Sequence, residues 1–105
     1  MILIHVISRN EEQASEIANF LVSKNLIISA CILEKTEVRK KSKNDTLISS
    51  TQFLIMGKTK ALLFNKIDKL LRKKYKERMP ELYSLAIVNM DWDKANELVE
   101  QTEKI

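Results

Sequence analysis

The order of four apolar, strand-like segments and two amphipathic helical patterns constrains the fold of this chain more than any other feature. The strand-like segments cover residues 1–8, 26–38, 47–58 and 82–88. Apolar and β-branched residues dominate the central parts of these segments, a composition typical of strands. Apolar residues at helical spacing fill the intervals 11–24 and 60–75. The chain is therefore predicted to be an α+β protein.

Helix boundary signals agree with this order. Asn10 is predicted to cap the first helix while Gln13 reaches back to it, and Asn25 is predicted to end that helix in a left-handed conformation. Thr59 is predicted to cap the second helix. Asp91 is predicted to cap a short acidic helix at the C-terminus.

The resulting order is β-α-β-β-α-β plus a terminal helix, the ferredoxin-like split arrangement with two helices on one face of an antiparallel sheet. Turn formers at 42–45 join the second and third strands into one long hairpin. The first strand is predicted to be central and buried on both faces. The lone Gly57 is expected at a bulge or a tight approach. The 105 residues fit one domain, 1–105.

The sheet face away from the two helices carries apolar residues that water would otherwise wet. Either the terminal helix or another subunit must cover it. We expect the chain to form a homotrimer by edge pairing of the hairpin strands. The N-terminus lacks an export signal, and no apolar run approaches the ~18 residues that cross a bilayer, so a cytoplasmic protein without membrane contact is expected.

Catalysis is not expected from this sequence, because its single histidine and single cysteine both lie inside apolar strands. Cys31 is predicted to be a small buried hydrophobe. His5 is predicted to be a core or interface residue with both ring nitrogens satisfied. A glycine-rich phosphate loop is also excluded, since the chain has one glycine.

A cluster of basic residues on and after the second helix is the strongest charged feature. Its members are Lys66, Lys69, Arg72, Lys73, Lys74, Lys76 and Arg78. Phosphate contacts by this cluster would make the protein an RNA-binding domain, a less favoured alternative because aromatic residues make up only 6% of the chain. Phe53 is the one residue expected to stack on a base. A solvated helix face is the favoured explanation of the cluster.

Several segments together resemble the CutA divalent-cation-tolerance proteins, small trimers of this fold. The similarity spans almost the whole chain and includes the Lys58-Thr59 pair before the second helix. The segments that carry it are Ile2–Glu12, Leu21–Leu26, Phe53–Thr59, Met79–Leu82 and the terminal Trp92 with Leu98. The chain departs from the family where the usual cysteine aligns with Ser29, and Cys31 stands where asparagine is common.

The resemblance implies a non-enzymatic trimer linked to divalent-cation tolerance. It implies Lys58 and Glu81 as ligand-pocket residues near a subunit boundary; otherwise they are a solvated strand-end lysine and a carboxylate paired with a backbone amide. No cofactor is certain, but the resemblance implies a copper-like divalent cation. Three copies of His5 or of Cys31 meeting on a threefold axis would hold it, or sulfur from Met56 or Met79. A regulatory trimer similar to the PII proteins is a further alternative.

Overall fold

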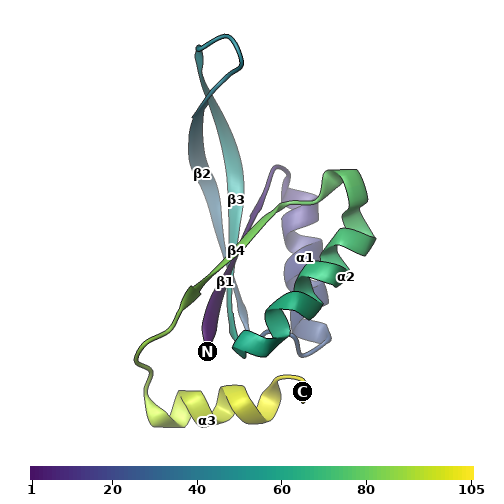
Figure 1. Ribbon diagram of the computed structural model, residues 1–105, viewed down its shortest axis with the longest axis vertical. Coiled ribbons are helices and arrows are strands. Elements are labelled where there is room, and N and C mark those ends of the chain that lie inside the picture. Colours follow the sequence, from purple (N-terminus) through teal and green to yellow (C-terminus); the bar gives the residue numbers. More distant parts are fainter.

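The computed structural model describes all 105 residues and contains one four-stranded antiparallel sheet in the order β2-β3-β1-β4 (Figure 1). The elements are β1 (Ile2–Ser8), α1 (Glu11–Ser23), β2 (Ala30–Lys41), β3 (Leu47–Thr59), the 3-10 helix η1 (Ala61–Leu63), α2 (Phe64–Tyr75), the 3-10 helix η2 (Lys76–Arg78), β4 (Glu81–Ala86) and α3 (Trp92–Gln101). Helices α1 and α2 lie on the same side of the sheet. The predicted ferredoxin-like α+β fold, its long hairpin and its terminal helix are confirmed.

The two faces of the sheet differ in burial. Ile2, Ile4 and Val6 of β1 are buried under α1 and α2 and belong to the main core. The residues between them point away from the helices and are half-buried, so β1 is central as predicted but is buried on one face only. We call this second face, defined by strand register, the open face. It consists of Leu3, His5, Ile7, Cys31, Leu33, Leu54, Met56, Lys58, Glu81, Tyr83 and Leu85.

The start of α1 is capped as predicted, but by one bond instead of two. The Gln13 amide donates to Asn10 Oδ1 at 2.6 Å. The Gln13 side chain does not reach back to Asn10: its Oε1 accepts from Ser8 Oγ at 2.5 Å and its Nε2 donates to the Arg78 carbonyl at 2.8 Å. This side chain therefore joins β1, α1 and η2. Asn25 has φ 58°, which confirms the predicted left-handed end.

The second strand begins at Ala30, not at residue 26 as predicted, and continues to Lys41 instead of 38. Leu26 and Ile27 are both buried and their amides donate to the Leu21 carbonyl at the end of α1. Two consecutive buried side chains belong to a chain reversal around the helix end, because strand residues alternate between faces. An apolar run in the sequence does not by itself distinguish a buried strand from a buried chain reversal.

Two further boundaries differ from the predictions. Thr59 does not cap the second helix, because its hydroxyl donates to the Leu26 carbonyl at 2.5 Å and Lys60 stands at the cap position of η1. The last strand covers Glu81–Ala86, one residue earlier than predicted at its start and two residues earlier at its end. The Ile87 amide still donates to the Met1 carbonyl, but Met1 precedes β1, so β4 has no strand to pair with beyond Ala86.

Gly57 marks a tight approach, as predicted. A Cβ added there would lie 2.6 Å from Ile27 Cδ1 and 3.0 Å from the Ser29 carbonyl oxygen. We expect Gly57→Ala to lower the free energy of unfolding by about 1–3 kcal/mol, measured by urea denaturation. Ile27→Val removes the nearest methyl group and should recover part of that loss in the double variant. An equal loss from Gly57→Ala in both backgrounds would contradict this explanation.

Helix α3 lies across the end of the sheet and does not cover the open face (Figure 1). Its Leu98 is fully buried, and its first turn is capped as predicted, since Asp91 Oδ1 accepts from the Lys94 amide at 2.8 Å. Lys60 Nζ donates to the carbonyls of Thr102 and Glu103, which fixes the segment after α3. The sequence suggested that either the terminal helix or another subunit covers the open face, and within this chain the terminal helix does not.

A hydrogen bond of 2.6 Å from Tyr75 Oη to Glu16 Oε1 joins α2 to α1. It lowers the pKa of Glu16, with Lys74 adding to the effect. Burial, with Glu16 adding, raises the pKa of Tyr75. The carboxylate therefore stabilises the fold above its ordinary pKa of 4.5, and this contribution is lost as pH falls. The tyrosine contributes below its ordinary pKa of 10.0, and that contribution is lost as pH rises.

We expect Tyr75→Phe to reduce the dependence of the unfolding free energy on pH in both the acid and the alkaline range. The acid range keeps a residual slope, because Lys74 still lies 3.5 Å from the Glu16 carboxylate. Urea denaturation at a series of pH values measures both slopes. Profiles of the same shape for the variant and the wild type would contradict the linkage.

Candidate metal and ligand sites

Strand register brings one histidine and two sulfur side chains into a single row across the open face. Cys31 of β2 pairs with Met56 of β3, and Met56 pairs with His5 of β1. Directly opposite residues of antiparallel strands have Cβ atoms about 4.5–5.5 Å apart. We call Cys31, Met56 and His5 the sulfur–imidazole row. Tyr83 of β4 pairs with His5 and ends the row.

The imidazole of His5 has one partner and one free nitrogen. Its Nδ1 lies 3.1 Å from Tyr83 Oη, and the two ring centroids are 5.1 Å apart. Its Nε2 is the only buried side-chain nitrogen or oxygen in the chain without a hydrogen-bond partner. The prediction that both ring nitrogens are satisfied is therefore wrong for Nε2. Leaving such an atom unpaired costs about 1–3 kcal/mol, and a ligand that binds it would remove the cost.

Cys31 is exposed, which corrects the prediction of a buried hydrophobe. It stands on the outer strand of the sheet and points to the open face, whereas its neighbour Ala30 packs against the core. The apolar sequence around it does not reveal this, because register decides which face a strand residue occupies. In the single chain the thiol is accessible beside Met56.

Lys58 and Glu81 do not come together within one chain. Lys58 stands beside Leu3 on β3, and Glu81 stands beside Ile7 on β4. Four residue steps along β1, from Leu3 to Ile7, separate these levels, roughly 13 Å along the strand. Both side chains are exposed. The two belong to opposite corners of the open face, and a shared pocket between them would require a second subunit.

No three His, Cys, Asp or Glu side chains converge in the chain. The sulfur–imidazole row offers three donor side chains only when the thioether of Met56 is counted. Met79, the other methionine considered from the sequence, lies away from the row and lines a cleft beside the hairpin. No helix is long and apolar enough to cross a membrane.

The family model of the CutA1 divalent ion tolerance protein matches residues 2–96. The chain belongs to the CutA1 family. Solved structures resemble it over nearly its full length at low identity. The divalent cation tolerance protein of Thermus thermophilus is 21% identical with a TM-score of 0.86, covering 98% of this chain and 100% of its own. No curated protein matches the chain.

Two further CutA1 structures show the same likeness. CutA1 from Oryza sativa is 18% identical with a TM-score of 0.88, covering 99% of this chain and 94% of its own. The protein from Archaeoglobus fulgidus, described as a periplasmic divalent cation tolerance protein, is 18% identical with a TM-score of 0.85, covering 98% of this chain and 100% of its own. At such identity these structures support the fold, and this CutA1 chain is a divergent member.

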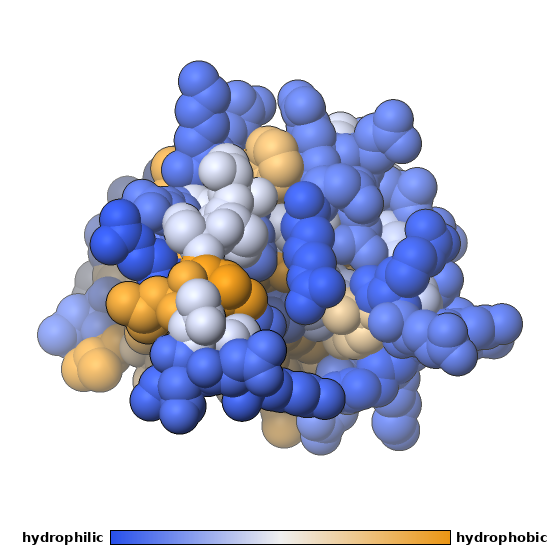
Figure 2. All heavy atoms as spheres, turned by 90° about the horizontal axis from the view of Figure 1, so that it is seen from above, coloured by the Kyte–Doolittle hydropathy of each residue, from blue (hydrophilic) through white to orange (hydrophobic).

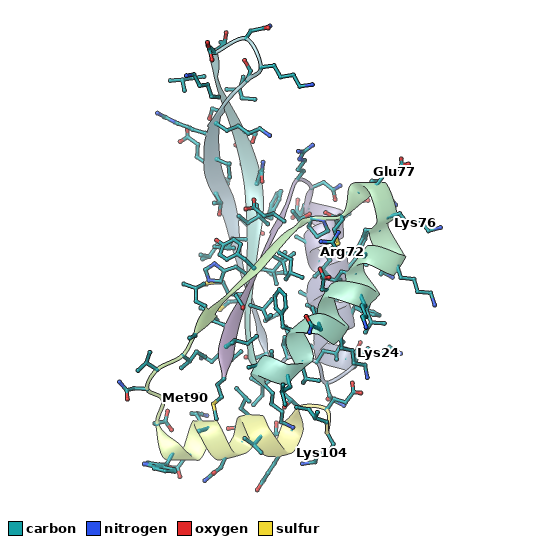
Figure 3. All side chains as sticks on the ribbon, in the orientation of Figure 1. Lys24, Arg72, Lys76, Glu77, Met90 and Lys104 are labelled. Carbon is teal, nitrogen blue, oxygen red and sulfur yellow. The ribbon has the colours of Figure 1, made fainter.

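Ion pairs reduce the charge of the basic cluster on α2 of this CutA1 protein. Lys66 pairs with Glu103, Arg72 with Asp68 and Lys74 with Glu16. Of its members, Arg72 and Lys76 lie with Glu77 at the end of α2 far from α3 (Figure 3). Phe53, the expected base-stacking residue, faces the helices and packs against the core, so that prediction is wrong. The RNA-binding alternative therefore has no residue of those predicted that could stack on a base.

A polar cleft of about 490 Å³ lies at the base of the hairpin of this CutA1 protein. It is lined by residues from β1, α1, the hairpin and the segment between α2 and β4. Its charged residues are Arg9, Lys40, Glu77, Arg78 and Glu81. The sequence had singled out only Glu81 as a ligand residue and Arg78 within the basic cluster. No sequence motif includes Arg9 and Lys40, because they are far apart in the chain and line the same cleft only in the folded structure.

Proposed function

We propose that this CutA1 protein is a homotrimer that binds a soft, copper-like metal ion on its open face, and that it contributes to divalent-cation tolerance by binding metal and not by catalysis. The observation that carries the proposal is the sulfur–imidazole row, whose His5 offers a buried nitrogen without a partner. The ion is cargo of this site. His5, Met56 and Cys31 would hold it.

The donor set of the row favours copper over hard cations. Thiolate and thioether ligands prefer Cu⁺ and imidazole suits copper and zinc, whereas Mg²⁺ and Ca²⁺ prefer oxygen ligands. Tyr83 Oη lies 3.1 Å from His5 Nδ1, so the hydroxyl oxygen can accept a hydrogen bond from Nδ1–H and leave the Nε2 lone pair free to bind the ion. The thiolate form of Cys31 is the one that would bind the ion.

Exposed apolar surface supports the trimer. Leu33, Tyr83 and Leu85 on the open face have exposed fractions of 49%, 40% and 46%. Monomeric soluble proteins seldom leave contiguous apolar area of this kind wet, and such area marks protein interfaces. The outer strands β2 and β4 also present unpaired backbone edges that another chain can pair with. Closing a ring of three chains would cover both features.

The thioether offers the most conservative test of metal binding. Met56→Leu keeps the size and apolar character of the side chain but removes the sulfur, so we expect about tenfold weaker Cu⁺ binding with an unchanged fold. A Cu⁺ titration against a competing chelator without oxygen measures the affinity. Met90→Leu, in the segment between β4 and α3 (Figure 3), is the matched control and should bind as the wild type. Equal affinities for both variants would remove Met56 from the site.

A further inference from the structure

The cleft at the base of the hairpin exists because β1 is shorter than the strands beside it. β1 ends at Ser8, opposite Phe53, whereas β2 and β3 continue pairing to Lys41 and Leu47. The edge of β3 over residues 47–52 therefore has no strand beside it on the β1 side. The start of α1 and the η2–β4 segment close the other walls. The volume of about 490 Å³ lies within the range of small-molecule sites, about 300–1,000 Å³.

Five charged side chains border this cleft without neutralising one another. They are Arg9, Lys40, Glu77, Arg78 and Glu81. All six ion pairs of the chain lie elsewhere. The remaining lining is largely polar, with amides from Asn10, Gln13 and Gln52. A polar site with unpaired charges of both signs favours a ligand that carries both signs.

The charges are arranged unevenly in the cleft. A second hollow of about 300 Å³ adjoins it and shares Arg9, Lys40 and Gln52, and its other lining residues are Ile48, Ser50 and Thr51. Arg9 and Lys40 thus also border a hollow that no carboxylate lines, whereas the η2–β4 segment contributes Glu77 and Glu81, which outnumber its one cation, Arg78. Figure 2 views the molecule from the side of the hairpin tip and shows mostly hydrophilic side chains around one hydrophobic patch.

We propose that this cleft binds a small zwitterion, with its carboxylate between Arg9 and Lys40 and its ammonium group at Glu77 and Glu81. A guanidinium binds a carboxylate through two parallel hydrogen bonds, and Lys40 adds a point charge. The two glutamates disfavour a ligand that is only anionic, since like charges repel. This site is separate from the metal row, and neither proposal depends on the other.

The test uses zwitterions of graded length and their singly charged analogues. Isotope-labelled full-length protein at low ionic strength is titrated with β-alanine, γ-aminobutyrate and aminocaproate, which differ in the separation of their two charges. Butyrate, caproate and hexylamine lack one charge each. We expect at least one zwitterion to shift amide resonances of Arg9, Lys40 and Glu81, at least tenfold more tightly than its singly charged analogues, and to be weakened by salt. Equal binding of the analogues, or no shift with any probe, overturns the proposal.

Matched charge removals locate the site. All five charged side chains are exposed in the single chain, so their replacement should not alter its folding, which circular dichroism checks. The double variant Arg9→Gln with Lys40→Gln should weaken the zwitterion at least tenfold, and Glu81→Gln should reduce the preference for it over caproate. Lys43→Gln removes the same charge at the hairpin tip, outside the cleft, and should bind as the wild type. Equal weakening by Lys43→Gln would reduce the effect to overall charge and overturn the proposal.

Discussion

Replacing Leu33 with aspartate should reduce the particle from three times the 12.2 kDa chain mass to a single chain. Leu33 lies on the open face opposite Leu54, with 49% of its surface exposed in one chain. In the trimer a carboxylate at this position is buried among apolar side chains without a partner, which costs several kcal/mol in each subunit. Native mass spectrometry, or light scattering, measures the mass directly.

The matched control for this variant is Leu62→Asp. Leu62 in η1 has an exposed fraction of 74% and lies outside the open face, so the same change should leave the trimer intact. Circular dichroism of both variants establishes that each chain remains folded. A folded Leu33→Asp protein of wild-type mass would show that the open face is not the subunit interface.

Replacing Cys31 with serine should abolish most of the copper affinity. The thiolate is the only anionic ligand of the sulfur–imidazole row, and a serine hydroxyl stays protonated and is a poor ligand for Cu⁺. We expect a loss of at least about 100-fold, because removing outer partners of a metal ligand alone costs about 10- to 100-fold. The change exchanges one small side chain for another at a position that is exposed in the single chain, so the folding of the chain should barely change.

Alkylation provides an independent measurement of the same contact. In the dissociated Leu33→Asp protein, where Cys31 is exposed as in the single chain, bound Cu⁺ should protect the thiol from iodoacetamide, and adding His5→Gln should weaken that protection at equal metal concentration. Reaction at the same rate with and without metal, in protein shown to retain copper, would place the ion elsewhere in the molecule.

Much of the fold follows from local patterns in the sequence. The helix caps at Asn10 and Asp91 lie where side-chain chemistry requires them, and Asn25 adopts the left-handed conformation expected at a helix end. The tight approach at Gly57 is confirmed because a lone glycine in a strand has few other uses. These features depend on a few neighbouring residues, so sequence reasoning is suited to them.

The candidate sites depend on strand register and on contacts between distant elements, which local patterns do not encode. Cys31 was expected in the core, yet one step of strand alternation places it on the open face beside Met56. Gln13 was assigned to its own helix cap, but it bonds Ser8 and the distant Arg78 carbonyl. The sequence identified His5, and only the structure reveals its unpaired nitrogen.

The central claim is that the open face holds copper through His5, Met56 and Cys31. X-ray absorption spectroscopy of the Cu⁺-loaded protein tests it most directly, because the spectrum distinguishes sulfur from nitrogen and oxygen ligands. We expect one imidazole nitrogen and two sulfur ligands, with one sulfur lost in Met56→Leu and no change in Met90→Leu. A first coordination shell of nitrogen and oxygen atoms alone, unchanged by Met56→Leu, would contradict the proposed site.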